Sequence, residues 1–258
     1  MTKNNNRPLI LISNDDGWEA PGINYLADVA SELGDVVVVA PDGPRSGASL
    51  SVTFHEPVKA RKVSEKDGLE VWACSGTPGD CIKLGLAEIC PRRPDLVLGG
   101  INHGDNSGVN VHYSGTMGVV IEGCLKGISS IGFSHCSHAM DTDFTPMRPY
   151  IKQIMEKVLA EGLPEGVCLN VNAPDTTEYQ GVKVCSMGQG IWGKEWERRQ
   201  SPRGWTYYWL VGEFTSSDDE NAETDYRMLK KGFFTITPTR IEMTAQEAVP
   251  LMKKMFEQ

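Results

Sequence analysis

The sequence predicts an α/β fold: a doubly wound, mostly parallel, Rossmann-like sheet, with a C-terminal extension that contains a β-hairpin and a terminal helix. Through about residue 180, short β-branched runs alternate with helix-length amphipathic segments, an order typical of βαβ units with right-handed crossovers. Two of these runs, Leu9–Ile12 and Val36–Ala40, are continuously apolar. Continuous rather than alternating apolar runs indicate parallel strands that are covered on both faces.

The remaining core elements follow the same order along the chain. Further strands are predicted at Leu69–Cys74, Asp95–Gly100, Ser130–Ser134 and Val167–Val171. Apolar residues at helical spacing predict helices at Pro21–Leu33, Asp80–Ile89, Gly115–Gly127 and Arg148–Glu161. Because ligands of such sheets bind beyond the carboxyl ends of the strands, we expect the chemistry in the polar loops there.

The character of the sequence changes after about residue 180. Aromatic residues gather in Trp192–Trp209, and we expect a hairpin around Tyr207–Glu213, a strand at Phe233–Thr237 and a helix over about Thr244–Phe256. Thr244 is the expected N-cap of that helix, with Glu247 three residues later as its capping-box partner. We therefore expect one domain over residues 1–258, with a core of about 7–180 and an extension of about 181–258.

Composition limits the classes of function. The 258 residues include 25 Lys+Arg and 34 Asp+Glu, a net charge of −9, which argues against binding of long nucleic acid because that requires surplus cations. A small anionic substrate needs local positive charge from a helix N-terminus, a few cations or a metal ion. Seven cysteines without a C-x-x-C pair favour the cytoplasm. The polar start of the chain and the short apolar run Pro8–Ile12 predict neither a signal sequence nor a membrane span.

Adjacent carboxylates follow the first predicted strand, in Asn14-Asp15-Asp16-Gly17. Two such charges repel each other unless a cation lies between them or they face different partners. Hard divalent ions such as Mg²⁺ and Mn²⁺ prefer oxygen ligands. The alternative is an ordinary turn, because these residue types are common in turns, but the position directly after a buried strand favours a metal site.

Two further loops at strand ends carry small polar residues. The loop Pro41–Ser49 offers hydroxyl and backbone N–H groups, although alone it is typical of any βα connection. The glycine-rich loop 99–108 leads to Ser114-Gly115-Thr116, at the start of a predicted helix. Such a helix start can bind an anion; the alternative is a glycine-rich loop that ends in an N-cap. The chain contains neither a dinucleotide-binding nor a P-loop motif.

Other candidates are weaker. His135 and His138 lie three residues apart, but a zinc site normally needs further Cys or His nearby, which favours a plain loop. His103 lies in the glycine-rich loop, where it could act as a general acid or contact a phosphate. The stretch Trp192–Trp209 interleaves aromatic residues with cations that could bind bases, although such a stretch is more often core or subunit interface.

In combination, these loops resemble the SurE survival-protein family of metal-dependent 5′/3′-nucleotidases. The matching segments run over nearly the whole chain: Ser13–Gly17, Ala40–Asp42 with Arg45–Ser46, Ser75–Cys81, Gly100–Asn106, Tyr113–Thr116, Asp225–Tyr226 and Gly232–Pro238. The chain departs from the family at Arg240, because many members carry a histidine shortly after the Thr-Pro that corresponds to Thr237-Pro238.

The resemblance implies a site and an assembly. One divalent metal ion per subunit, Mg²⁺ or Mn²⁺, would be held by Asp15, Asp16, Ser46 and Asn102. Asn106, Ser114, Gly115 and Thr116 would cradle the phosphate, and Asn14 would support the site. The family's C-terminal segments exchange between subunits, which implies a homodimer or homotetramer.

We therefore expect hydrolysis of nucleoside 5′- and 3′-monophosphates or other small phosphomonoesters, with Asp15 and Asp16 as the catalytic residues. Either a water activated by the metal or an aspartate would attack the phosphorus. One alternative is a phospho-receiver signalling module, which also binds Mg²⁺ beside an acidic pair but needs a third Asp where this chain has Asn102 or Ser134. Another is a nucleotide- or RNA-binding protein that uses the Trp192–Trp209 stretch.

Overall fold

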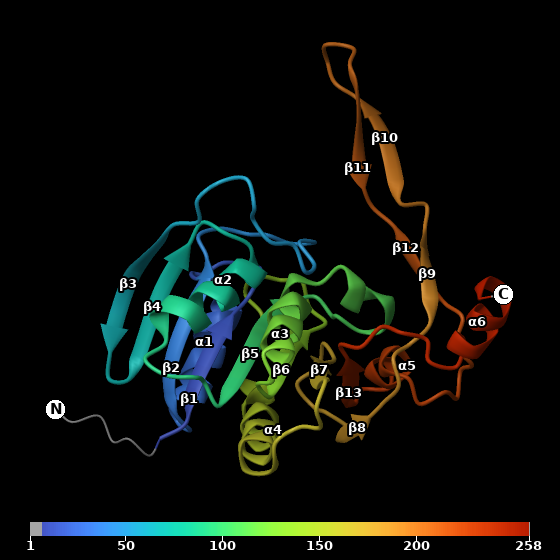
Figure 1. The fold of residues 1–258 in the computed structure, drawn as a ribbon. Helices are drawn as coiled ribbons and strands as arrows, with labels where there is room; N and C mark the ends of the chain where they lie inside the picture. Colours follow the sequence, from blue (N-terminus) through green and yellow to red (C-terminus); the bar gives the residue numbers. More distant parts are fainter. Residues whose placement is uncertain (1–6, 258) are drawn as a thin grey trace.

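The computed structural model describes residues 7–257, and a nine-stranded sheet forms its centre (Figure 1). The polar residues 1–6, on which the absence of a signal sequence was in part predicted, lie outside the described residues. The strands of this sheet are β1 (Leu9–Ser13), β2 (Asp35–Pro41), β3 (Ala60–Lys66), β4 (Leu69–Cys74), β5 (Leu96–His103), β6 (Ser130–His135), β7 (Val167–Ala173), β8 (Val182–Val184) and β13 (Phe234–Arg240). Their order across the sheet is β3-β4-β2-β1-β5-β6-β7-β13-β8.

The six strands from β4 to β7 in this order run parallel to one another. Antiparallel pairs occur only at the sides of this block, where β3 pairs with β4 and β13 with β7. The predicted doubly wound, mostly parallel sheet is therefore confirmed. The sequence pattern did not reveal β3, because its residues are polar and mostly exposed, as edge strands often are.

Helices cover both faces of the sheet. On one face, α1 (Pro21–Ser31) and α4 (Arg148–Glu161) bury their apolar residues in the largest core cluster. On the other face, α2 (Pro78–Leu84), which continues as the short π-helix η1 (Gly85–Ile89), packs beside α3 (Gly115–Leu125). The helix predicted from Asp80 begins two residues earlier, because Thr77 caps it and Pro78 suits the first turn.

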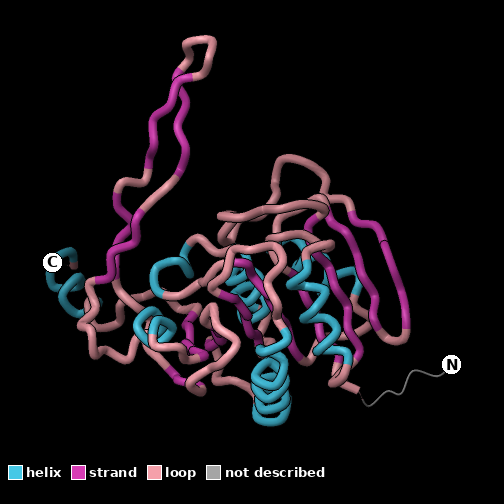
Figure 2. Tube along the Cα trace, turned by 180° about the vertical axis from the view of Figure 1, so that it is seen from behind, coloured by secondary structure: helices cyan, strands magenta, loops and turns pink. Residues whose placement is uncertain are grey.

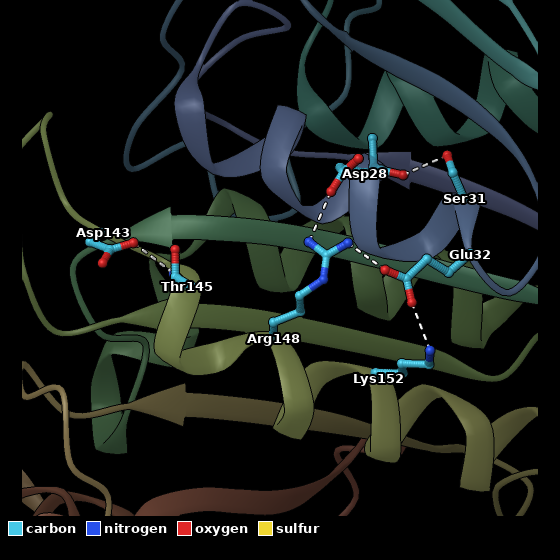
Figure 3. A network of polar contacts seen from close by, with 8 residues as sticks. Asp28, Ser31, Glu32, Asp143, Thr145, Arg148 and Lys152 are labelled. Carbon is cyan, nitrogen blue, oxygen red and sulfur yellow. Dashed lines mark hydrogen bonds and ion pairs between the residues drawn. The ribbon is translucent and has the colours of Figure 1, made fainter.

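Charged side chains join the two helices of the first face. Arg148 of α4 pairs with Asp28 at 2.8 Å and also with Glu32, both on α1 (Figure 3). Lys152 lies one turn further along α4 and pairs with Glu32 at 2.7 Å. This network fixes the position of α4 beside α1 at the rim of the apolar core.

The extension differs from the prediction in its hairpin, which is longer than expected. β9 (Gly190–Gly193) pairs with β12 (Glu213–Ser216), and β10 (Trp196–Gln200) pairs with β11 (Thr206–Leu210). The two pairs form one long arm that projects from the body of the molecule (Figures 1 and 2). The predicted hairpin at Tyr207–Glu213 covers only the returning side of this arm, because the turn lies at residues 201–205.

The helices of the extension are α5 (Asp225–Lys230) and α6 (Val249–Phe256). The prediction that the last helix begins at Thr244 is wrong. A helix from Thr244 would place Pro250 in its interior, where it lacks an N–H donor, whereas Pro250 lies in the first turn of α6. Thr244 instead donates its backbone N–H to Glu242 Oε1 at 2.9 Å. Within residues 7–257, no helix is both long enough and apolar enough to cross a membrane.

Candidate active site

The polar loops after β1, β2 and β5 meet at the N-terminus of α3, as the parallel sheet predicts. Around them lies a cavity of about 530 Å³. Five of the predicted site residues line it, namely Asp15, Ser46, Asn102, Asn106 and Ser114. A larger cavity of about 790 Å³, lined by Arg7, Asp35 and Arg92 among others, contains none of the predicted residues.

The turn after β1 presents the two carboxylates. Asn14 is buried, donates its side-chain amide to Gly17 O at 3.0 Å, and accepts the Gly17 N–H at 3.1 Å. Gly17 has φ +103°, a conformation that favours glycine. The turn and the metal site are therefore not alternatives here, because the turn residues Asn14 and Gly17 position Asp15 and Asp16. The role of Asn14 as a supporting residue agrees with these contacts.

Asp15 lies in direct contact with the start of α3. Its side chain accepts a hydrogen bond from Thr116 Oγ1 at 2.6 Å, and burial raises the pKa of this carboxyl to about 6. Gly115 makes this approach feasible, because a Cβ atom there would lie 2.6 Å from Asp15 Cβ. The first strand end and the predicted phosphate loop therefore fit together only with glycine at position 115.

Asp16 is half-buried and has a free acceptor atom. Its Oδ2 is buried and has no hydrogen-bond partner in the described part of the chain. Burial raises the pKa of the Asp16 carboxyl, and the neighbouring His103 lowers it in part. A buried carboxylate oxygen without a partner is costly, so this atom fits the role of a ligand to a cation.

The other two proposed metal ligands come from neighbouring loops. Asn102 donates its side-chain amide to Gly104 O at 2.8 Å, which leaves its Oδ1 directed toward Thr116 Oγ1, 3.4 Å away. Ser46 lies on the exposed loop after β2, and Ser49 ties that loop to the α3 start by donating to His112 O at 2.7 Å. Sequence reasoning did not single out Ser49 for this role.

The donor set fits a hard divalent cation. Asp15, Asp16, Ser46 and Asn102 offer carboxylate, hydroxyl and amide oxygens, the ligand types that Mg²⁺ and Mn²⁺ prefer. Residues 7–257 contain no cluster of three or more His, Cys, Asp or Glu that could hold a metal. The proposed set is not such a cluster, because Ser46 and Asn102 are of other residue types. None of the residues that line the cavity is Lys or Arg. The positive charge that a phosphate needs must therefore come from the N-terminus of α3, from the lining histidines His103 and His138, or from a bound cation.

The start of α3 offers polar groups to a phosphate. Ser114 is the N-cap, and its Oγ accepts the Met117 N–H at 3.0 Å, so its own hydroxyl proton stays free to donate. The Thr116 hydroxyl, in contrast, already donates to Asp15. Thr116 thus contacts the metal ligands through its side chain, and only its backbone N–H is available to a phosphate.

Asn106 is held by a buried network that the sequence did not reveal. Its backbone N–H donates to Asn172 Oδ1 at 2.8 Å, and its carbonyl accepts the Asn170 side-chain amide at 2.7 Å. Its own amide donates to Ser134 Oγ at 2.8 Å. The sequence does contain a signal of this network, because Asn170 and Asn172 alternate with apolar residues in a buried strand.

The sequence favours a solvated loop for Asp225, together with the acidic residues 218–220, and for Asp225 this prediction is wrong. Its fully buried carboxylate accepts the backbone N–H groups of Gly108 at 3.1 Å and Gly188 at 2.8 Å, and the Thr237 hydroxyl at 3.2 Å. It therefore joins the glycine-rich loop after β5, the base of the long arm and β13. The phosphate loop depends on the extension through this carboxylate.

The histidines, Arg240 and the aromatic stretch that the sequence singled out lie in different parts of the fold. His135 is buried, and its Nδ1 accepts the Ser137 N–H at 3.1 Å, a local loop contact. His138 and His103 line the cavity, and His103 Nδ1 lies 3.0 Å from Ala139 O. Arg240 ends β13 and does not line the cavity. Residues of the Trp192–Trp209 stretch form most of the long arm.

Comparison with known proteins agrees with the geometry. The model of the family "Survival protein SurE" matches residues 10–194. The chain is 56% identical to the 5′-nucleotidase SurE of Phocaeicola vulgatus over 93% of each chain, and 53% identical to that of Bacteroides thetaiotaomicron over 93% of this chain and 92% of the other. Its fold is similar to the crystal structure of the SurE protein from Aquifex aeolicus, with a TM-score of 0.83, 37% identity, and coverage of 96% and 99% of the two chains.

Proposed function

Since this chain belongs to the SurE family and is a 5′-nucleotidase, we propose that it hydrolyses nucleoside monophosphates in the cavity beside Asp15, Asp16 and the N-terminus of α3. The observation that carries this assignment is the charge of the cavity: its lining holds carboxylates but no Lys or Arg. Such a cavity accepts a phosphate dianion only together with a cation. We also propose activity on 3′-monophosphates and on other small phosphomonoesters.

We propose that Asp15, Asp16, Ser46 and Asn102 hold one divalent ion, Mg²⁺ or Mn²⁺. The unpartnered Asp16 Oδ2 and the directed Asn102 Oδ1 support this assignment. A divalent ion bound there supplies charge that neutralises phosphoryl oxygens and makes a bound water more acidic. Thr116 keeps the Asp15 carboxylate in one orientation by donating to it.

The residues of the chain then bind and orient the phosphate. The free hydroxyl proton of Ser114, the Thr116 backbone N–H at the helix N-terminus, and Asn106 would face the phosphoryl oxygens, where negative charge develops. Gly115 would allow the close approach at the helix start, because its own backbone N–H already hydrogen-bonds Asp15. Asp15 or Asp16 would orient the attacking water and accept its proton, while the bond from phosphorus to the sugar oxygen breaks and that oxygen takes a proton from solvent to leave as the nucleoside hydroxyl. An aspartate that attacks phosphorus directly would form an acyl phosphate, which acid quenching would trap.

The phospho-receiver alternative lacks its third carboxylate. Ser134 lies one residue before the end of β6, at the place where such a module needs an Asp, and its hydroxyl accepts a hydrogen bond from the Asn106 amide. Ser134 thus supports the predicted phosphate contact Asn106. The nucleotidase assignment explains this contact, whereas the receiver module does not.

We propose that the extension makes the protein a homodimer or homotetramer. The arm exposes Trp196, Trp205, Tyr208, Trp209 and Leu210, and α6 buries none of its residues although it carries Leu251, Met252 and Phe256. Exposed apolar groups in such numbers mark an interaction surface. Light scattering should give the mass of two or four chains, and a monomeric mass would contradict this proposal.

The one-domain organisation and a cytoplasmic location are part of the same proposal. β8 and β13 of the extension lie in the sheet of the core, which supports one domain over the described residues. All seven cysteines are free thiols in the structure, as is typical of reducing compartments.

The function is tested by a phosphate-release screen. Nucleoside 5′- and 3′-monophosphates and simple phosphomonoesters are incubated with the purified chain, with and without added Mg²⁺ or Mn²⁺. We expect release from 5′-monophosphates in the presence of the metal. No release from any ester with either metal would refute the proposed function.

A further inference from the structure

The base of the long arm contributes an aromatic wall to the active-site cavity. Trp192 of β9 lines the same cavity as Asp15 and Ser114, and it is exposed. Leu210 and Val211, from the returning side of the arm, line the cavity as well. The cavity thus has a polar part at the strand ends and a mostly apolar part at the arm, where Glu195 adds a carboxylate.

The indole of Trp192 is fixed in place. Its Nε1–H donates to Asn110 Oδ1 at 2.9 Å, and Asn110 lies in the short 3₁₀-helix η2 (Gly108–His112) that leads toward Ser114. The indole also packs on Phe214, with ring centroids 5.6 Å apart. Gly212 gives it room, because a Cβ atom there would lie 2.9 Å from Trp192 Cε3. A ring held in this way loses little freedom when a ligand packs on its open face.

We propose that Trp192 forms the nucleobase subsite of this enzyme, with the base lying on its indole. The inference rests on the proposed function. A volume of about 530 Å³ exceeds what a phosphate group alone requires and lies within the range of small-molecule sites, about 300–1,000 Å³. The phosphate would lie at α3, and the base would extend toward the apolar part of the cavity.

This subsite predicts recognition by ring stacking rather than by base-specific hydrogen bonds. Every nucleobase has a π-face, so stacking on an aromatic side chain tolerates all bases. Purines overlap the indole more than pyrimidines do. The enzyme should therefore accept all bases and bind purine monophosphates more tightly.

Trp192→Ala tests the subsite when AMP is compared with ribose 5-phosphate, which has the sugar and the phosphate but no base. For AMP, we expect KM to rise about tenfold, the effect of one lost base–aromatic contact. For ribose 5-phosphate, kcat/KM should stay unchanged. Trp192→Phe keeps an aromatic face and should lose much less than Trp192→Ala. Phe54→Ala, at an exposed aromatic residue that does not line the cavity, is the control and should leave both KM values unchanged.

Two outcomes would overturn the subsite. An equal loss on AMP and ribose 5-phosphate would mean that Trp192 only supports the fold, and an unchanged KM for AMP would mean that the base binds elsewhere. Calorimetric binding of adenosine to the wild type and to Trp192→Ala tests the subsite without turnover. Failure of the proposed function is distinguishable, because the wild type would then release phosphate from neither ester while adenosine binding still reports on Trp192.

Discussion

Replacing Asp16 with asparagine is expected to lower kcat for phosphate release from AMP by about 1,000-fold, the scale of losing a principal charge at a transition state. Asparagine keeps the size of the side chain but removes one of the two negative charges that hold the cation. The fold should persist, because the substitution also removes a desolvated carboxylate that lies beside Asp15. Phosphate release measures the expected loss of activity, and thermal unfolding of the same preparation measures whether the fold persists.

A matched control comes from the β3–β4 turn. Asp67 lies there with φ +45°, a conformation that asparagine tolerates, and it does not line the candidate active site. Asp67→Asn should keep wild-type activity. If Asp16→Asn also kept it, the assignment of the carboxylate pair to the metal and to catalysis would be wrong.

Removal of divalent metal is expected to weaken binding of inorganic phosphate and of AMP by at least about 100-fold. At 4 Å, two like charges repel by about 4 kcal/mol at an effective dielectric constant of 20, and the phosphate would face two carboxylates without a neighbouring Lys or Arg among the cavity-lining residues. Calorimetric titration of the protein with phosphate, before and after dialysis against a chelator, measures the loss.

The control for this loss is the same chelator saturated with Mg²⁺, which should leave phosphate binding intact. If added Mg²⁺ or Mn²⁺ restores phosphate binding, the metal-free protein remained folded. Binding of equal strength in the metal-free protein would contradict the proposal, because positive charge would then reach the phosphate from a source outside this site.

The parallel core of the fold could be predicted because its strands are buried on both faces. Two of these strands, Leu9–Ser13 and Leu96–His103, begin with apolar runs. Such runs indicate strands that helices must cover on both faces. Apolar runs could not reveal β3, because an edge strand whose residues are mostly exposed needs no apolar pattern. The start of α6 was misplaced because a plausible cap at Thr244 outweighed the helix-breaking effect of Pro250.

The predicted site residues come from loops that a parallel sheet must bring to one edge, and the structure does bring Asp15, Ser46, Asn102 and Ser114 around one cavity. Residues that act on the site from distant segments carry no sequence pattern that links them to these loops. Asn172 reaches Asn106 from β7, and Trp192 reaches the cavity from the arm. Their roles depend on tertiary packing, which sequence periodicity does not describe.

The strand that separates β7 from β8 is synthesised after all the other strands of the sheet. A chain emerges from the ribosome at about 5–20 residues per second, N-terminus first, so β1 to β7 are available well before β13 at Phe234–Arg240. Until β13 arrives, β7 has an open edge, and Gly108 lacks the carboxylate of Asp225 that holds it. A translation product interrupted before β13 therefore contains the proposed metal ligands but not the framework that holds the proposed phosphate loop. We expect enzymatic competence only after the ribosome has passed Arg240.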